Sequence, residues 1–265
     1  MKGNNMTEKI TSKDNSLIKH IAKLMSSAKY RHENACFVCE GIRLCMDAVF
    51  SGAQIICFCF TEKAFEKNRE NAGLICSAAK RCVELSAPLF SKLSGTDTPQ
   101  GFLCIVRSEE KSFKAEKGSC YAALERIQDP SNLGTILRTA EALGADGVIL
   151  SSDCCDVYSP KVVRGSMGAV FRLPVCIVED LTQTVWELGK KGIRTFASTP
   201  RNAVNINETD FSDGGVMLIG NEGNGLDDST IDACTDRVMI PMKGRAESLN
   251  ASAAASILLY KLICG

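Results

Sequence analysis

Polar residues that could bind or activate a small ligand gather in three short segments of the chain. The segments are 128–138 (QDPSNLGTILR), 220–226 (GNEGNGL) and 247–250 (ESLN), and each follows an apolar run. Their amide, hydroxyl, carboxylate and guanidinium groups can orient a substrate through hydrogen bonds and charge. In open α/β sheets, ligands bind at the carboxyl ends of the strands, so we expect the three segments to contribute to one site.

The first segment opens a predicted helix. Pro130 ends the preceding strand, and Ser131 or Asn132 is expected to cap the helix. Arg138 follows Asn132 by six residues, near enough to a multiple of 3.6 that we expect both to point toward the same end. The alternative is that Asn132 only caps the helix and Arg138 is a surface charge.

Three glycines mark the second segment, and they permit a ligand to approach the backbone closely. Their spacing is GxxGxG rather than the GxGxxG of a dinucleotide fold, and no acidic residue follows at a suitable strand end. A nicotinamide-dependent enzyme is therefore disfavoured. A tight turn explains the glycines but leaves Glu222 unexplained.

An alanine-rich helix is predicted directly after the third segment. The small side chains at 251 and 253–255 permit very close packing on a neighbouring element. Ser248 could serve as the N-cap of this helix, which is the purely structural alternative. At such a dense junction, Ser248 and Asn250 need hydrogen-bond partners.

The rest of the chain alternates between predicted strands and helices. Runs such as 216–220 (VMLIG) are apolar throughout, which predicts strands buried on both faces and a parallel sheet with crossover helices. The charged segment 108–118 is expected to be a linker between a small α/β domain at 1–107 and a larger one at 119–265. The expected helices are 15–27, 42–51, 132–143, 159–167 and 181–190, and the expected strands are 36–39, 54–60, 83–85, 101–106, 120–126, 147–151, 172–178, 194–197, 216–219 and 237–242.

A net charge of zero conceals an asymmetry along the chain. Residues 1–107 hold 15 Lys and Arg against 10 Asp and Glu, whereas residues 119–265 hold 13 against 18. A basic front suggests contact with a polyanion such as nucleic acid. A solvated lysine-rich helix explains the charge equally well.

Composition disfavours several other classes of protein. No apolar run reaches the roughly 18 to 20 residues of a membrane helix, and the N-terminus lacks the apolar core of a secretory signal, so we expect a cytoplasmic protein. The 14 cysteines fall within apolar runs and are expected to act as small buried hydrophobes in a reducing compartment. Cys36 and Cys39 have CxxC spacing, but no second pair follows, so we expect no metal site.

Taken together and in order, the three segments resemble the motifs of the SpoU branch of the SPOUT RNA methyltransferases. The resembling stretches are NLGTILR, MLIGNEGNGL and IPMKGRAESLNASAAA. Residues 159–175 resemble that family's loop between the first and second motifs. Residues 37–49 and 89–103 resemble its N-terminal RNA-substrate-binding domain, so nearly the whole chain is covered.

The resemblance implies an α/β fold with a small RNA-binding domain before a C-terminal SPOUT domain. The SPOUT domain is expected to have a mostly parallel sheet and a deep trefoil knot, a rare exception to the rule that chains do not thread loops. The resemblance also implies S-adenosylmethionine bound in the knot and an active homodimer formed through the knotted domain. On that interpretation, the alanines let the threaded segment and a partner subunit approach closely.

The implied reaction is methyl transfer from the sulfonium of S-adenosylmethionine to a ribose 2′-hydroxyl of RNA. Arg138 matches the family's catalytic arginine, either as a general base or, more easily for a protonated guanidinium, as a phosphate contact. Asn132 matches the asparagine that fixes the surroundings of this arginine, and Glu222 matches a glutamate that orients polar groups across the dimer junction. Ser248 and Asn250 match the pair that line the cofactor and substrate site. The implied cofactor-binding positions are Ser198, Thr199, Gly220, Asn221, Gly225, Ile240, Met242, Ser248 and Leu249.

Chain length and the N-terminal domain favour ribosomal RNA as the substrate class. Two alternatives stay open. One is the same chemistry on transfer RNA. The other is a catalytically idle RNA-binding protein, such as a ribosome assembly factor, which the intact motif residues disfavour.

Overall fold

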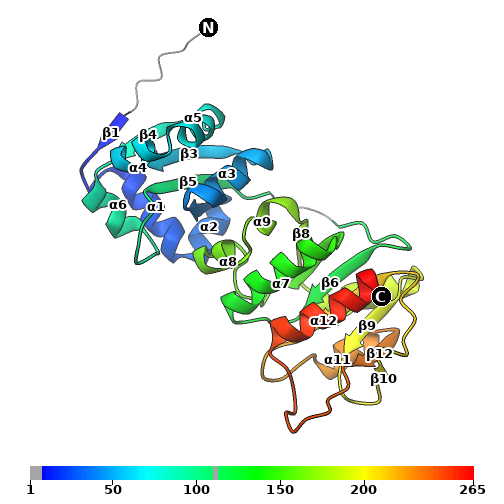
Figure 1. Cartoon of the computed structure of the whole chain (residues 1–265). Coiled ribbons are helices and arrows are strands. Elements are labelled where there is room, and N and C mark those ends of the chain that lie inside the picture. The colour runs from blue at the N-terminus through cyan, green and yellow to red at the C-terminus, as the bar shows by residue number, and fades with distance from the viewer. Residues whose placement is uncertain (1–7, 110–112) are drawn as a thin grey trace. The chain divides into compact units, whose positions relative to one another are not determined.

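The protein is described by a computed structural model that covers residues 8–109 and 113–265. Its backbone divides into two compact units, coloured along the chain in Figure 1. Unit 1 holds the residues up to Glu109 together with Tyr158–Phe171, and unit 2 holds the remainder. The expected linker at 108–118 includes residues 110–112, which lie outside the described residues.

Unit 1 is built on a mixed sheet of five strands in the order β1-β4-β3-β5-β2. The strands are β1 (Glu8–Ile10), β2 (Cys36–Glu40), β3 (Ile55–Phe60), β4 (Cys82–Leu85) and β5 (Phe102–Arg107), and the helices are α1 (Ser16–Ser26), α2 (Ala28–Asn34), α3 (Ile42–Phe50), α4 (Glu62–Lys67), α5 (Arg69–Ala78), α6 (Ala87–Leu93) and α8 (Pro160–Gly165). Apolar residues of α1 and α6 pack on one face of this sheet. Helices α3 and α5 pack on each other and against β5 and β3.

A segment from much later in the sequence completes unit 1. Tyr158 stacks on Phe37 of β2 with 4.6 Å between ring centroids. Phe171 stacks on the same ring at 5.8 Å, and Phe37 is left only 2% exposed. The helix expected at 159–167 is therefore present as α8, but its membership of unit 1 was not predicted.

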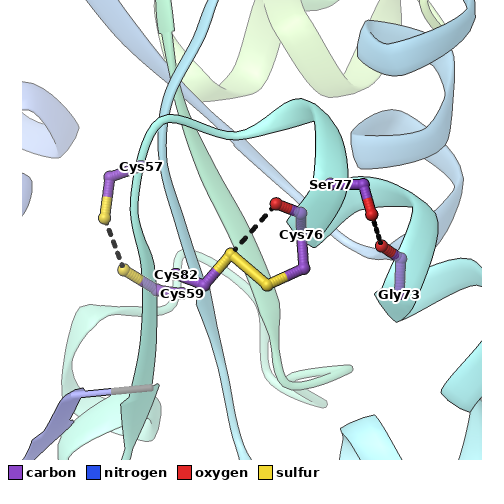
Figure 2. The surroundings of a disulfide bond; sticks show 6 residues. All are labelled: Cys57, Cys59, Gly73, Cys76, Ser77 and Cys82. Carbon is purple, nitrogen blue, oxygen red and sulfur yellow. Dashed lines mark hydrogen bonds between the residues drawn. A yellow bond between two sulfur atoms is a disulfide. The ribbon is translucent and has the colours of Figure 1, made fainter. Parts of the chain in front are cut away.

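The cysteines depart from expectation at one pair. Cys76 at the end of α5 and Cys82 at the start of β4 form a disulfide, shown in Figure 2. Their Cα atoms are 5.8 Å apart, which is an ordinary disulfide separation. Nearby, Cys57 and Cys59 form no disulfide, and a hydrogen bond of 3.8 Å joins their Sγ atoms. The expectation that cysteines act only as small hydrophobes is wrong for Cys76 and Cys82.

Three further cysteines of unit 1 meet in the core. The Sγ atoms of Cys39, Cys45 and Cys104 lie within 4.8 Å of one another, and all three residues are fully buried. Among the described residues, this is the one group with the spacing of metal ligands. Cys36, the other half of the CxxC pair, is not a member. Three sulfur ligands fall short of the four that a structural zinc site takes.

Unit 2 is built on a seven-stranded sheet in the order β10-β12-β9-β11-β6-β7-β8. The strands are β6 (Cys120–Leu124), β7 (Gly147–Ser151), β8 (Val175–Val178), β9 (Thr195–Ser198), β10 (Val204–Asn205), β11 (Gly215–Ile219) and β12 (Asp236–Met239), and the helices are α7 (Pro130–Leu143), α9 (Ala169–Arg172, shared with unit 1), α10 (Leu181–Lys190), α11 (Asp228–Ala233) and α12 (Ala251–Cys264). Every neighbouring pair of strands is parallel. The central strand β11 is buried at all five positions, which confirms the inference from its apolar run.

Helices cover both faces of this sheet. On one face α12 lies beside α7 (Figure 1) and packs on β11 and β6. On the other face α10 and α11 share an apolar core with the central strands. The predicted α/β class with a mostly parallel sheet is confirmed. No helix in the described residues is long and apolar enough to cross a membrane.

The helix N-termini near the polar segments differ from prediction. The carboxylate of Asp129, rather than Ser131 or Asn132, caps α7 by accepting the Ser131 N–H at 2.8 Å. Asn250, rather than Ser248, caps α12, because its Oδ1 accepts the Ser252 N–H at 2.9 Å. Since capping does not occupy the Asn132 side chain, it is available for other contacts.

Some strand ends and some whole elements differ from the prediction. β6 and β12 end at Leu124 and Met239, earlier than expected. Beyond β6 the backbone leaves the sheet at Arg126, which adopts a left-handed conformation with φ of 52°. The short strands β1 and β10 and the helices α2, α4, α5, α6, α9 and α11 were not predicted.

Candidate active site

The three polar segments meet at the carboxyl edge of the sheet in unit 2. The first follows β6, the second follows β11, and these strands are neighbours. The third segment follows β12, crosses the edge, and leads into α12, which packs beside α7. Parallel strands thus bring the segments to one edge, as expected.

Glu222 lies at the centre of this edge. Its carboxylate accepts the main-chain N–H groups of Gln128 at 3.2 Å and Asp129 at 3.1 Å. It also accepts the Asn132 Nδ2 at 3.0 Å. The second segment is therefore bonded to the first through one carboxylate, a connection that spacing could not have revealed.

Asn132 carries the connection onward to the third segment. Its Oδ1 accepts the Nδ2 of Asn250 at 3.0 Å. The Oδ1 of Asn250 in turn caps α12, accepting from Ser252 and from the Ala253 N–H at 3.3 Å. A continuous chain of hydrogen bonds thus runs from Glu222 through Asn132 to Asn250, and it joins all three segments.

The glycine-containing loop that bears Glu222 is a closed turn. Asn221 and Gly225 exchange main-chain hydrogen bonds of 3.0 Å, and the Asn221 Oδ1 accepts the Gly223 N–H at 2.9 Å. Gly225 adopts a φ of 70°. At Gly220 a Cβ would lie 2.1 Å from the carbonyl carbon of Gly225, so no larger residue fits without moving the turn. These glycines are explained by the turn itself.

The hydrogen bonds to Glu222 also set its charge. Partial burial raises the pKa of the Glu222 carboxyl, but the Asn132 amide and the main-chain donors outweigh burial and lower the pKa overall. The carboxylate is therefore held ionised at neutral pH. It is built to accept hydrogen bonds rather than to donate a proton.

Arg138 does not join this cluster. It lies in the middle of α7, is exposed, and its side chain has no hydrogen-bond or ion-pair partner in the described chain. Six residues at about 100° each place it about 120° around the helix from Asn132 and about 9 Å along the axis. The expectation that both point toward the same end is wrong. Asn132 bonds to Glu222 and Asn250 instead of contacting the arginine.

The positions expected to bind a cofactor lie along the same edge. Ser198 ends β9, and the Thr199 N–H donates to Val238 O at 3.0 Å. β9 lies between β12 and β11, so Ser198, Ile240 and Gly220 occupy adjacent strand ends.

The loop 243–249, which includes most of the third segment, is open. Within the described chain, no hydrogen bond or ion pair holds residues 243–249. Ser248 is exposed, and the apolar side chains of Met242 and Leu249 are 40% and 38% exposed. The dense junction expected around Ser248 and Asn250 is absent from this part of the described chain, where both residues are exposed.

Some residues of the edge had no assigned role in the sequence. Gln128 and Asp129 contribute N–H groups, and the Arg126 guanidinium forms a two-pronged ion pair with Asp227. Pro130 could have predicted that Asp129 caps α7. Proline favours the first helical position, and the N-cap is the residue before it. No comparable signal marks Arg126.

Two family models match the chain. Residues 119–260 match the SpoU rRNA Methylase family, and residues 15–104 match the MRM3-like substrate binding domain.

Characterised and uncharacterised relatives match over nearly their full lengths. The chain is 30% identical over 256 residues to the 23S rRNA guanosine 2′-O-methyltransferase RlmP of Bacillus subtilis, covering 96% of this chain and 99% of that protein. It is 32% identical over 253 residues to an uncharacterised tRNA/rRNA methyltransferase of Synechocystis, covering 95% and 92%.

Solved structures show the same arrangement of elements. An AdoMet-bound rRNA methyltransferase from Sinorhizobium meliloti aligns with a TM-score of 0.87 at 30% identity, covering 97% of both chains. The SpoU methyltransferase AviRb from Streptomyces viridochromogenes, in complex with AdoMet, aligns with a TM-score of 0.86 at 25% identity, covering 94% of this chain and 97% of that one.

Proposed function

The chain belongs to the SpoU rRNA methylase family, and on that premise we propose that it transfers a methyl group from S-adenosylmethionine to a ribose 2′-hydroxyl of ribosomal RNA. The observation that carries this proposal is the hydrogen-bond chain from Glu222 through Asn132 to Asn250. It unites the three motifs at the sheet edge where an α/β fold binds ligands.

The open third segment fits the adenosine part of the cofactor. Its main-chain donors and acceptors at 243–249 have no partners in the described chain, and Met242 and Leu249 offer exposed apolar surface beside them. An adenine ring needs both kinds of contact. We propose that these residues, with Ser248, hold the cofactor together with the strand-end positions Ser198, Thr199, Gly220, Asn221, Gly225 and Ile240.

When bound, S-adenosylmethionine supplies an electrophilic methyl group on a sulfonium, so the protein has chiefly to orient the ribose hydroxyl. Glu222, held ionised, fixes Asn132, and Asn132 fixes Asn250 beside the open segment. Arg138 is exposed and unpaired in the described chain. Because a solvated guanidinium keeps its proton, the role that suits it is a contact with an RNA phosphate.

We propose a division of labour between a substrate-binding domain at 1–107, a linker at 108–118 and a methyltransferase domain at 119–265. The excess of basic residues in the first part fits RNA, because phosphate contacts supply affinity that does not depend on sequence. The proposed setting is the cytoplasm, and no metal is required for the reaction.

A homodimer formed through unit 2 is also part of the proposal, as is the deep trefoil knot. α12 is apolar on its outer side as well as its buried side. Ala253, Ile257, Tyr260 and Cys264 recur at helical spacing and are exposed, with Ile257 at 41% and Tyr260 at 56%. A helix that is apolar all round is normally covered. A second copy of the chain would cover this face of α12, which lies beside α7.

Sedimentation velocity tests the dimer. Ile257→Glu should convert a dimer to a monomer, whereas Leu74→Glu, at a similarly exposed leucine of unit 1, should leave the dimer intact. A wild-type monomer at micromolar concentration would contradict this part of the proposal.

Two measurements test the reaction. Calorimetric titration with S-adenosylmethionine should show binding, and mass mapping of ribosomal RNA incubated with protein and cofactor should show one new 2′-O-methyl nucleotide. A mark on transfer RNA instead would favour the transfer-RNA alternative. Absence of both binding and a mark would favour the idle RNA-binding protein.

A further inference from the structure

Arg126 holds an unusual place in the backbone of unit 2. It follows β6 and adopts a φ of 52°, in the left-handed region that side-chain-bearing residues disfavour. Such a conformation persists when the surrounding structure enforces it. The contacts of Arg126 show what that structure is.

The main chain of Arg126 is bonded on both sides. Its N–H donates to the Oγ of Ser151 at 2.9 Å, at the end of the neighbouring strand β7. Its carbonyl accepts the Nδ2 of Asn221 at 2.8 Å. Asn221 precedes Glu222, so this bond fixes the start of the loop that bears the carboxylate.

The side chain of Arg126 fixes the other end of the same loop. Both terminal nitrogens donate to the carboxylate of Asp227, which follows the loop directly. Asp227 is the N-cap residue of α11, yet its side chain makes no capping hydrogen bond. That carboxylate is therefore available to bind the guanidinium, and its hydrogen bonds and its charge raise the pKa of Arg126.

One residue thus anchors both ends of the loop 221–226, through Asn221 and through Asp227. The loop's carboxylate, Glu222, receives N–H groups from Gln128 and Asp129, which follow Arg126 directly. A change at Arg126 would therefore shift the donors and the acceptor of the same hydrogen bonds.

We propose that Arg126 is a positioning residue for methyl transfer, acting through Asp227 and Asn221 on the placement of Glu222. This inference rests on the proposed function for its kinetic readout. In the described chain, Arg126 makes no hydrogen bond to Glu222, Asn132 or Asn250, and we do not propose that it contacts the substrate.

The main test is Arg126→Gly. Glycine adopts a positive φ freely, so the variant keeps the turn and loses only the guanidinium. We expect kcat for methyl transfer to fall between about 10-fold and 100-fold, with the Kd for S-adenosylmethionine changed by less than about twofold. The amides of Gln128 and Asp129 should exchange hydrogen at least about 10-fold faster, while those of β6 exchange as in the wild type.

A matched control lies at the opposite edge of the same sheet. Arg194 forms an equally two-pronged ion pair with Asp236, and the side chains there are 33% and 30% exposed, against 29% and 48% for Arg126 and Asp227. Arg194→Ala should lower the thermal midpoint and leave kcat unchanged. Equal losses of kcat in the two variants would overturn the proposal, because the effect would then be general stability.

Exchange of the two charges gives a second test. Asp227→Arg alone should lower kcat, and combining it with Arg126→Asp should restore kcat to within about threefold of the wild type, since aspartate tolerates the left-handed region. A double variant no better than the singles, or an Arg126→Gly enzyme as fast as the wild type, would overturn the proposal. If the wild type methylates no RNA, the proposed function fails, and the amide exchange still decides whether Arg126 positions the Glu222 loop.

Discussion

Two parts of the candidate site are held in opposite ways. We call Asn132, Glu222 and Asn250 the tied residues, because hydrogen bonds join them to one another. The loop that bears Glu222 is also held at both ends. The untied residues Arg138, Ser248 and Leu249 are exposed and have no polar side-chain partner in the described chain. The untied residues come from the first and third motifs, which also supply two of the three tied residues.

The contrast between the tied and untied residues corresponds to two requirements of a binding site at this sheet edge, which are a fixed geometry and groups that can still bind a ligand. Hydrogen bonds that are complete within the chain fix geometry before any ligand arrives. Side chains and main-chain groups without partners keep their bonding capacity for a ligand, an RNA or a second subunit. Changes in the tied set should therefore affect stability and function together, whereas changes in the untied set should affect function alone.

The largest effect is expected from an untied residue. Arg138→Ala should slow methyl transfer by about 100-fold or more, in the range of other lost charge-stabilising groups. The free energy of unfolding should change by less than about 0.5 kcal/mol, because the side chain is exposed and unpaired. Methyl-transfer kinetics and urea unfolding measure the two quantities, with Lys191→Ala as an exposed control. Unchanged turnover would remove Arg138 from the catalytic set.

A substitution at a tied residue should lower both the rate of methyl transfer and the free energy of unfolding. Asn132→Ala removes one hydrogen-bond partner from Glu222 and one from Asn250, so we expect a rate loss of about 10-fold to 100-fold and a loss of about 1–3 kcal/mol in unfolding free energy. The control is Asn224→Ala, at an exposed asparagine of the glycine loop. An Asn132→Ala protein as stable as the wild type would break the contrast between the two sets.

The charge of Glu222 gives a prediction in pH. Its folded-state pKa is lowered below the ordinary value of 4.5, so the stability it contributes is complete above that value and is lost as the pH falls through the folded pKa. Glu222→Gln should therefore be less stable than the wild type at neutral pH, and the difference should shrink below about pH 4.5. Urea unfolding across this range measures it. A difference that grew on acidification would mean the pKa is raised.

The smallest effect is expected at Leu249. Leu249→Ala should weaken binding of S-adenosylmethionine by about fivefold, equivalent to about 1 kcal/mol, with no measurable change in unfolding. Calorimetric titration checks this against Leu74→Ala, a similarly exposed leucine in unit 1. Unaltered binding would mean that Leu249 does not contact the cofactor. The contrast between tied and untied residues would then depend on Arg138 and Ser248.

Continuous apolar runs predicted the central strands and the parallel sheet, because a strand that is buried on both faces has apolar residues at nearly every position. The helix at 132–143 and its end at Gly144 were equally legible, and Gly144 adopts the left-handed conformation at φ of 85° that such an end requires. Short edge strands left no trace. β1 buries one residue of three, so it shows no alternation.

For the candidate site, the motifs predicted residues but not the contacts among them. Asn132, Glu222 and Asn250 were identified from motif type, yet the bonds among them join positions 90 and 118 residues apart. The choice of Asn250 over Ser248 as a cap could not be predicted, because the two residue types cap equally well. The left-handed turn at Arg126 depends on partners from the end of β7 and from the loop of Glu222, and its own residue type argues against it.

The completion of unit 1 by Tyr158–Phe171 bears on how the protein is made. During synthesis at about 5–20 residues per second, Phe37 leaves the ribosome seconds before the two rings that cover it. β6 and β7 of unit 2 emerge in the interval, since both precede Tyr158. The N-terminal unit is thus finished by a later part of the nascent chain, and a ribosome stalled before residue 158 would present an aromatic surface that the completed protein hides.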